Sequence, residues 1–459
     1  MLILQGNSKE GLGKALVLCI CLLTASCTPR PERSYPIPTK QQLEWQQLET
    51  YAFIHFGLNT FNDMEWGYGN TPSYTFNPTN LDCEQWVLTL KACGMKGVIF
   101  TAKHHDGFCL WPTETTDYNI TNTPYKNGEG DVVGELCEAC RKHGLLFGVY
   151  LSPWDRHQAS YGSDDYVKLY HQQIQELVDH YGPFFEFWFD GANGGDGWYG
   201  GVCESRSIKA EQYYQYDKTR EIIWSKYPNT MIFGGTVPTI RWIGNEKGIA
   251  EATQWCNYTH DFQDLNNTQL LSIGIPDGEY WLPAEVDVSL RPGWFYHENE
   301  APKSLEELLD IYYKSVGRNA SLLLNFPVAP NGRISPADST RAVEWYQTLQ
   351  QTFANNLLKD FKPVVNYEGT QPEWVYTFKE PTVVSHVVLE EDVLYGQHVE
   401  RFSLCYYRNG KWLPVETDEE LTTIGFKRII RFKPATMEKL RIRIIKTQAP
   451  VCFYRISCY

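Results

Sequence analysis

One carboxylate in this chain follows directly on a long run of aromatic residues. The run Phe184–Phe189 is apolar apart from Glu186, and Asp190 and Gly191 come next. Apolar runs of this length are typical of buried strands. Asp is disfavoured inside a strand, so we expect Asp190 at the strand's end, with Gly191 opening a loop. Parallel barrels carry their chemistry at such strand ends, which makes Asp190 a candidate catalytic carboxylate; the alternative is a helix N-cap or a loop Asp.

Other chemically useful residues occupy the same position relative to apolar runs. They carry imidazole, phenol and indole groups: His55, His104, His105, Tyr150 and Trp188. If the runs are strands of one parallel barrel, these side chains meet at one end of it. Aromatic rings can stack on the C–H faces of a sugar, and imidazoles can hydrogen-bond to its hydroxyls. The set therefore suits a sugar-binding pocket around a carboxylate.

The cluster His104-His105-Asp106 could instead bind a metal ion. Adjacent residues of a strand point to opposite faces, so His104 and His105 would chelate one ion poorly. The chain also contains no His-x-His or His-Glu-x-x-His spacing. We therefore expect no metal and no cofactor, with a metal-dependent hydrolase as a rival hypothesis. One of the two imidazoles could equally be a core residue.

The elements that would position these residues alternate regularly up to residue 358. We expect strands at 51–57, 97–102, 145–150, 184–189, 230–233 and 321–326, and helices at 82–92, 132–143, 164–180, 213–227, 304–316 and 336–358. Repetition of strand and helix predicts a parallel sheet, and the number of units favours a (β/α)8-like barrel over residues 41–358. The stretch 241–300 fits the repeat poorly, so the later part of the barrel should be irregular.

The pattern changes after about residue 361. The runs 383–389, 402–407 and 440–445 are β-like, and Asn409-Gly410 is a hairpin signal. A long helical pattern does not return. We expect a C-terminal β-sandwich over residues 361–459, so that the whole chain is an α/β barrel followed by a sandwich.

Composition limits the classes of partner. The chain has 459 residues, 42% of them hydrophobic, and a formal net charge of −14. This length is enough for two or three domains with a large core. An acidic chain argues against a nucleic-acid partner, because binding to phosphates requires a basic surface.

The first residues have the pattern of a targeting segment. Lys9 and Lys14 precede an apolar run at 15–23, which is too short to span a bilayer and fits a signal peptide over residues 1–26. The residues before Cys27 resemble a bacterial lipoprotein processing site, with Cys27 as the acylated residue; the alternative is simple cleavage near Ser26. Residues 27–40 are rich in Pro and charge and fit a tether. We expect an exported protein, periplasmic or anchored to a membrane.

Five segments carry a longer pattern, in order along the chain. They are Phe-Ile-His-Phe-Gly at 53–57, Glu65-Trp66, Thr-Ala-Lys-His-His-Asp-Gly-Phe at 101–108, Trp-Phe-Asp-Gly at 188–191, and Asn-Phe-Pro-Val-Ala-Pro-Asn-Gly at 325–332. Together they resemble the α-L-fucosidases of glycoside hydrolase family 29. The resemblance covers about residues 41–358, and the expected tail agrees with the C-terminal sandwich of that family.

The resemblance implies a retaining glycosidase without a cofactor. Asp190 would be the nucleophile that forms a glycosyl-enzyme intermediate, and a second carboxyl about 5 Å away would act as acid and then as base. The segment 241–248 resembles the branch of the family that prefers α-1,3/1,4-linked fucose, which makes Glu246 the expected acid/base. The alternative is that Glu246 is an exposed loop residue, in which case Glu251 or Glu285 would take the role.

The resemblance also implies contacts with the sugar. Eight residues match positions that bind fucose in the family: His55, Glu65, Trp66, His104, His105, Tyr150, Trp188 and Trp294. The imidazoles and Tyr150 would hydrogen-bond to hydroxyls, and Trp188 would place its ring against the sugar. Trp294 would face the fucose methyl group or serve in packing. Arg241 could be a ligand or part of a strand-end salt bridge.

The resemblance implies that the protein hydrolyses terminal α-L-fucosyl linkages of branched glycans. The substrate would be a fucosylated oligosaccharide or glycoconjugate. The alternative is a non-catalytic glycan-binding surface lipoprotein. The tail, around residues 396–402, resembles galactose-binding-like sandwiches of the discoidin type; we expect it to pack on the barrel, with glycan binding as the alternative.

Overall fold

The computed structural model describes residues 35–259, 268–368 and 371–459. The expected signal peptide at 1–26, the acylation site Cys27 and most of the expected tether at 27–40 lie outside these ranges. Among the helices of the described ranges, none is both long enough and apolar enough to cross a membrane.

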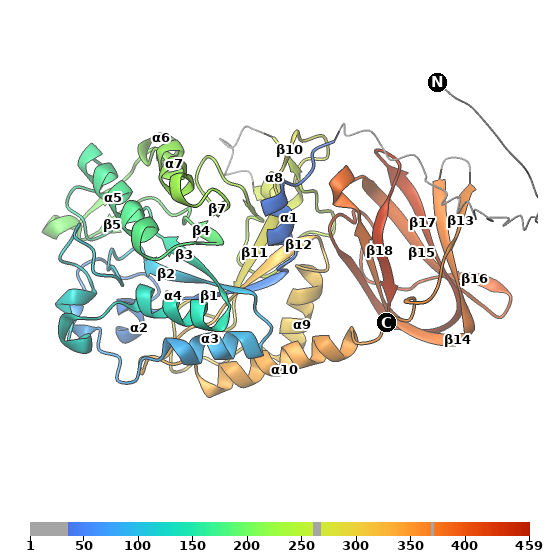
Figure 1. Cartoon of the computed structure of the whole chain (residues 1–459), viewed down its shortest axis with the longest axis horizontal. Coiled ribbons are helices and arrows are strands. Elements are labelled where there is room, and N and C mark those ends of the chain that lie inside the picture. Colours follow the sequence, from blue (N-terminus) through green and yellow to red (C-terminus); the bar gives the residue numbers. More distant parts are fainter. Residues whose placement is uncertain (1–34, 260–267, 369–370) are drawn as a thin grey trace, which may run out of the picture.

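Eight parallel strands form the first sheet, in the order β7-β4-β3-β2-β1-β12-β11-β8. The strands are β1 (Thr50–Ile54), β2 (Gly97–Lys103), β3 (Leu146–Leu151), β4 (Glu186–Trp188), β7 (Met231–Phe233), β8 (Arg241–Trp242), β11 (Ala284–Ser289) and β12 (Ala320–Asn325). A parallel bridge between Phe233 and Ile240 joins the two outer strands. The expected (β/α)8-like barrel is therefore confirmed (Figure 1).

Helices follow most of the strands and surround the barrel. The longer ones are α3 (Cys83–Ala92), α4 (Val132–His143), α5 (Asp164–His180), α7 (Tyr216–Lys226), α9 (Leu305–Lys314) and α10 (Pro336–Thr352). Shorter ones are α1 (Lys40–Gln46), α2 (Leu58–Phe61), α6 (Ala210–Tyr213) and α8 (Thr268–Ile273). Their starts follow local chemistry: the side chains of Asp82, Asp131, Ser304 and Ser335 each accept a hydrogen bond from a backbone N–H of the first turn.

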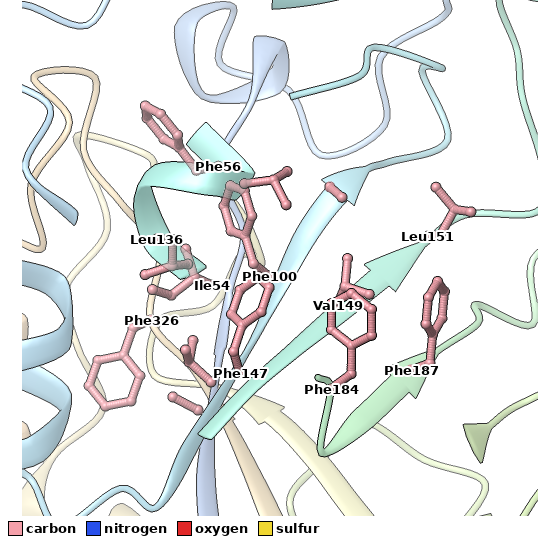
Figure 2. Packing of buried hydrophobic residues seen from close by; sticks show 14 of the residues in the cluster. Ile54, Phe56, Phe100, Leu136, Phe147, Val149, Leu151, Phe184, Phe187 and Phe326 are labelled. Atoms are coloured by element: carbon pink, nitrogen blue, oxygen red, sulfur yellow. The ribbon is translucent and has the colours of Figure 1, made fainter. Parts of the chain in front are cut away.

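Alternating residues of each strand belong to two different apolar layers. Ile54, Phe100 and Val149 belong to one outer cluster that also contains Leu136 of α4 and Phe184 (Figure 2). Their neighbours Phe53, Ile99 and Tyr150, together with Trp188, form a separate cluster inside the barrel. This two-sided burial explains why the strands read as continuous apolar runs in the sequence.

The second half of the barrel is irregular, as expected. The link from β7 to β8 contains no helix, and the link from β8 to β11 carries α8 and a hairpin of β9 (Asn257–Tyr258) and β10 (Tyr280–Trp281). Strand β11 is not among the expected strands. Its alternating Glu285 and Asp287 resemble a solvent-facing pattern, yet both side chains are buried in the barrel interior.

The C-terminal region is antiparallel, which confirms the expected sandwich. Its strands are β13 (Val364–Glu368), β14 (Gln371–Glu391), β15 (Val399–Arg408), β16 (Lys411–Pro414), β17 (Arg428–Thr447) and β18 (Phe453–Cys458). They follow the order β13-β14-β17-β15-β16, and β18 pairs with β14. The sandwich has its own apolar core and lies beside the barrel (Figure 1). A small hairpin, β5 (Gly195–Gly197) with β6 (Glu204–Arg206), follows β4 in the barrel.

Buried hydrogen bonds join the sandwich to the barrel. Gln397 accepts from the backbone N–H of Cys256 at 2.8 Å and donates to the carbonyl of Gln254 at 2.7 Å. The backbone N–H of Phe426 donates to Oδ1 of Asn319 at 2.7 Å. Gln397 belongs to the segment 396–402 that resembles discoidin-type sandwiches, so part of that segment is occupied by contact with the barrel.

Candidate active site

Asp190 lies two residues beyond β4. It stands at the C-terminal ends of the barrel strands, the region that we call the mouth. Its Oδ1 accepts a hydrogen bond from the backbone N–H of Ala192 at 2.7 Å, and its Oδ2 accepts from the hydroxyl of Tyr150 at 3.1 Å. Its side chain is 24% exposed. The carboxylate is thus held in one orientation and remains open to a ligand.

His105 presents a hydrogen-bond acceptor beside Asp190. Its Nδ1 is 2.7 Å from Oγ of Ser152, and that hydroxyl donates its own hydrogen to the carbonyl of Trp154 at 2.7 Å. Nδ1 must therefore be the donor, which leaves a lone pair on Nε2. Nε2 lies 3.7 Å from Oδ2 of Asp190, and burial lowers the pKa of His105. A neutral ring in this tautomer can accept a hydrogen bond from a sugar hydroxyl.

His55 is also a neutral ring with a free lone pair on Nε2, but different hydrogen bonds fix its tautomer. Asn325 donates from its amide to Oγ of Ser289 and to the carbonyl of Trp294, both at 2.8 Å, so its Oδ1 faces His55. That oxygen is 2.8 Å from Nδ1 of His55, which must donate to it. Burial lowers the pKa of His55 to about 3. Its Nε2 therefore carries a lone pair, as in His105.

His104 lies between the other two imidazoles. Its ring stacks on Tyr150 with 5.7 Å between centroids, and 4.2 Å separates it from the ring of His105. Its Nδ1 is buried and has no hydrogen-bond partner within the described ranges. Burial and the neighbouring imidazoles hold the pKa of His104 well below its usual value. A ligand in the mouth could satisfy this ring.

The expectation that His104 and His105 point to opposite faces is wrong. Strand β2 ends at Lys103, so the alternation of a strand no longer applies to the two residues after it. Lys103 takes the opposite direction and pairs with Asp155 at 3.3 Å in the core. Among the residues that the structure describes, three or more His, Cys, Asp or Glu side chains nowhere gather in a way that could hold a metal ion.

Trp188 forms an aromatic layer beneath the mouth. It stacks between Tyr150, at 5.2 Å, and Phe233, at 4.3 Å. Its indole N–H donates to Oε1 of Glu285 at 2.9 Å. Glu285 also accepts from the hydroxyl of Tyr51, and burial raises its pKa to about 7. Glu285 is therefore enclosed below the ring of Trp188.

Glu246 lies in the loop after β8. Its Oε2 accepts a hydrogen bond from the indole N–H of Trp294 at 3.3 Å. Partial burial raises its pKa, the hydrogen bond from Trp294 opposes that rise, and the charges of Asp190 and Glu65 add to it. The two carboxyl groups expected to act in catalysis are thus in electrostatic reach of each other. Both Glu246 and Glu251, one of the two alternatives, are exposed at the surface, and Glu246 also hydrogen-bonds to Trp294 at the mouth.

Glu65 and Trp66 have different roles at the mouth: Glu65 binds a neighbouring loop, and Trp66 places an exposed ring beside His105. Glu65 accepts from the backbone N–H groups of Trp294 at 2.9 Å and Phe295 at 3.0 Å, so it holds a neighbouring loop. Trp66 is 54% exposed, with its ring 5.0 Å from that of His105. Trp294 lies 5.2 Å from the ring of His55. All eight expected sugar contacts are therefore at or near the mouth.

Sequence reasoning overlooked several residues that organise this site. Asn325 and Ser152 stand at or just beyond the ends of β12 and β3, so the strand-end rule that found Asp190 could have found them. His297 lies in an irregular loop and gave no signal. Arg241 is buried and donates to Gln254 and to backbone carbonyls, and within the described ranges its side chain forms no ion pair.

A parallel barrel with paired carboxyl groups, neutral imidazoles and stacked aromatic rings at its mouth defines a sugar-cleaving hydrolase. A family model described as Alpha-L-fucosidase matches residues 34–351. The chain belongs to this family, the α-L-fucosidases of glycoside hydrolase family 29.

Relatives support the same class along most of the chain. Alpha-L-fucosidase 1 of Arabidopsis thaliana is 39% identical over 438 residues, which cover 88% of this chain and 83% of the relative. A solved family 29 member from an unknown rumen bacterium is 46% identical, with a TM-score of 0.89 over 93% of this chain and 77% of the other. A Ruminococcus gnavus family 29 fucosidase in complex with fucose is 32% identical, with a TM-score of 0.81 over 92% and 95%.

Proposed function

We propose that this α-L-fucosidase removes terminal α-L-fucosyl residues with retention of configuration, with Asp190 as nucleophile and Glu246 as acid/base. The observation that carries the proposal is the pairing at the mouth. Asp190 is a carboxylate fixed by two donors, and Glu246 is a carboxyl whose pKa is raised, first by loss of contact with water and then by the charge of Asp190. These are the two different environments that a nucleophile and a proton donor require.

In the first step, the carboxylate of Asp190 attacks the anomeric carbon of the fucosyl group. The bond from that carbon to the glycosidic oxygen breaks, and the protonated carboxyl of Glu246 transfers its proton to this oxygen. In the second step, Glu246 removes a proton from water as the water oxygen attacks the anomeric carbon. The bond to Asp190 breaks and fucose is released with the original configuration.

The rest of the mouth supplies recognition of the sugar. The lone pairs on Nε2 of His55 and His105 accept hydrogen bonds from hydroxyls. The two faces of Trp188 are covered by Tyr150 and Phe233, so its ring supports the pocket from below. The substrate is a fucosylated oligosaccharide or glycoconjugate. The relative from Ruminococcus gnavus, described as a complex with fucose, supports this choice.

The preferred linkage is α-1,3 or α-1,4. The support is the segment 241–248, whose sequence resembles the branch of the family with that preference. Hydrolysis rates on matched trisaccharides carrying fucose in α-1,2, α-1,3 or α-1,4 linkage test it. A faster rate on the α-1,2 compound would reject this part of the proposal.

Azide rescue tests the roles of the two carboxyl groups. On an activated aryl fucoside, Asp190→Ala with azide should give β-fucosyl azide, because azide replaces the nucleophile. Glu246→Ala with azide should give α-fucosyl azide, because azide attacks the intermediate without needing a base. Rescue of Glu251→Ala or Glu285→Ala instead would show that Glu246 is the wrong acid/base. If the pure wild-type protein releases no aryl alcohol, the alternative of a non-catalytic glycan-binding lipoprotein is favoured.

The protein is exported and anchored by lipid at Cys27, or else periplasmic after simple cleavage. The support is the sequence of residues 1–27. Membrane fractionation of a bacterial host that expresses the full chain distinguishes the two. Cys27→Ala should move the activity from the membrane fraction to the soluble fraction, whereas an unchanged distribution would argue against the anchor.

A further inference from the structure

The side chain of His297 lies between two carboxylates at the edge of the active site. Its Nδ1 is 2.5 Å from Oδ1 of Asp63, and its Nε2 is 2.7 Å from Oε1 of Glu65. An ionised carboxylate accepts hydrogen bonds and donates none, so each ring nitrogen must carry a hydrogen. With both carboxylates ionised, His297 is an imidazolium cation.

The groups around His297 favour this charge. Burial alone would lower the pKa of His297, but hydrogen bonds to Asp63 and Glu65 and the charges of Glu65 and Glu300 raise it. Only 13% of the side chain is exposed. Arg291, the cation on the same loop, donates to the backbone carbonyl of His297 at 3.2 Å rather than facing its ring.

Glu65 connects His297 to the backbone of the same loop. Its Oε2 accepts from the N–H of Trp294, and its Oε1 accepts from both Phe295 and His297. The packing is tight: a Cβ atom at Gly293 would lie 2.7 Å from Oε1 of Glu65 and 2.8 Å from Cδ2 of His297. The orientation of Glu65 is therefore determined by the cation on one side and the loop backbone on the other.

Trp294 extends this connection to Glu246. Its indole N–H donates to Oε2 of Glu246 at 3.3 Å, which favours the ionised carboxylate, while the charge of Glu65 disfavours it. The strength of the hydrogen bond from Trp294 depends on the position of its indole ring. The effect of Glu65 on the pKa of Glu246 depends on how much of the charge of Glu65 is offset by His297.

We propose that His297 is a positioning residue for acid/base chemistry at Glu246, acting as a cation through Glu65 and Trp294. The inference rests on the proposed role of Glu246. It assigns no contact between His297 and the sugar.

Loss of the cation should affect proton transfer more than the rest of the reaction. In His297→Gln the charge of Glu65 is no longer offset and the loop loses one restraint. Both changes make Glu246 a weaker acid. A poor leaving group departs only with a proton, whereas an activated one departs without it, so the loss should depend on the leaving group.

The experiment compares kcat/KM for phenyl fucoside and 2,4-dinitrophenyl fucoside over a range of pH. His297→Gln should lose about tenfold to a hundredfold on the phenyl compound, with a much smaller loss on the dinitrophenyl compound. Its alkaline limb on the phenyl compound should move to higher pH. His297→Arg, which keeps a cation with several donors, should recover part of the loss. His180→Gln, at the exposed end of α5, is the matched control and should behave as wild type.

Equal losses on both substrates, or an unmoved alkaline limb, would overturn the inference. Thermal unfolding of each variant shows whether the fold survives. If His297→Gln does not fold, Asp63→Asn replaces it, because the side chain of Asp63 is 82% exposed and its loss removes one of the two carboxylates that hold the cation. It should show the same leaving-group dependence, to a smaller degree.

Glu246→Gln, measured in parallel, separates this inference from the proposed function. If Glu246→Gln loses activity equally on both substrates, the role of Glu246 fails. If Glu246→Gln depends on the leaving group and His297→Gln does not, only the role of His297 fails.

Discussion

The indole N–H of Trp188 donates to Oε1 of Glu285 at 2.9 Å. This hydrogen bond holds the ring of Trp188, under the mouth, against a carboxyl group inside the barrel. Glu285 and Glu186 are both fully buried. Burial raises the pKa of Glu186, and the charge of the nearby Glu285 raises it further. Two such carboxyl groups are costly to ionise together. The support under Trp188 is therefore a neutral or singly charged pair.

Replacement of Glu285 by Gln should change the pH dependence of stability. Burial raises the pKa of Glu285 from 4.5 to about 7, so the folded protein binds this proton more tightly than the unfolded chain. The contribution is present below pH 4.5 and is lost as the pH rises to about 7. Urea denaturation should show the free energy of unfolding falling less over this interval in Glu285→Gln than in wild type. An identical slope in the two proteins would contradict the assignment.

Tyr150→Phe should lower activity while preserving the aromatic stack. The substitution removes the hydroxyl that donates to Asp190 but keeps the ring against Trp188. A hydrogen bond to a charged group contributes about 1.5–3 kcal/mol, which corresponds to a loss of about tenfold to a hundredfold in kcat/KM on an aryl fucoside. Tyr74→Phe, at an exposed site, is the matched control. Full activity in Tyr150→Phe would show that this bond plays no part in the reaction.

Trp294→Phe should move the alkaline limb of kcat/KM to higher pH. The indole N–H of Trp294 lowers the pKa of Glu246 against the rise caused by partial burial. Without that donor the pKa rises further, so Glu246 keeps its proton to higher pH. The pH profile on a fucoside with a poor leaving group measures the shift. Trp66→Phe removes an indole that does not contact Glu246 in this structure, so its limb should stay in place.

Asp338→Asn should destabilise the loop that carries Trp294. Asp338 accepts from Nε of Arg291 at 2.9 Å and 3.0 Å, and both side chains are almost fully buried. Loss of one partner leaves a buried charge without compensation, at a cost of about 3–5 kcal/mol. Thermal unfolding should show a clearly lower midpoint. Asp165→Asn breaks an exposed pair with Lys168 and should leave the midpoint unchanged.

Much of the barrel could be predicted because its apolar pattern and its helix signals agree. Helices α4 and α5 begin and end at the expected residues, since Asp131 caps one and Gly144 terminates it, and the other has a strongly amphipathic face. Strand β11 was missed because period-two patterning cannot distinguish a polar face turned to solvent from one turned into a barrel.

Some site residues could be predicted from local sequence patterns and others could not. Asp190, His55 and Tyr150 are residues at or just beyond strand ends, which a single sequence can indicate. The relationship of Glu65 to Trp294 joins two loops far apart in the chain and depends on how those loops fold over the mouth. Neither composition nor spacing contains that information, so only the folded chain brings the two residues together.

Gln397 and Phe426 of the sandwich form hydrogen bonds with residues 254–256 and Asn319 of the barrel. These bonds limit how the enzyme could be truncated or recombined with a relative. A barrel cut free at residue 358 would expose amide and carbonyl groups that now have partners in the sandwich. Barrel and sandwich therefore rely on each other to satisfy these buried polar groups, so neither can be exchanged without regard to the other. A chimera that borrows its C-terminal half from a relative would need that relative to supply an equivalent glutamine.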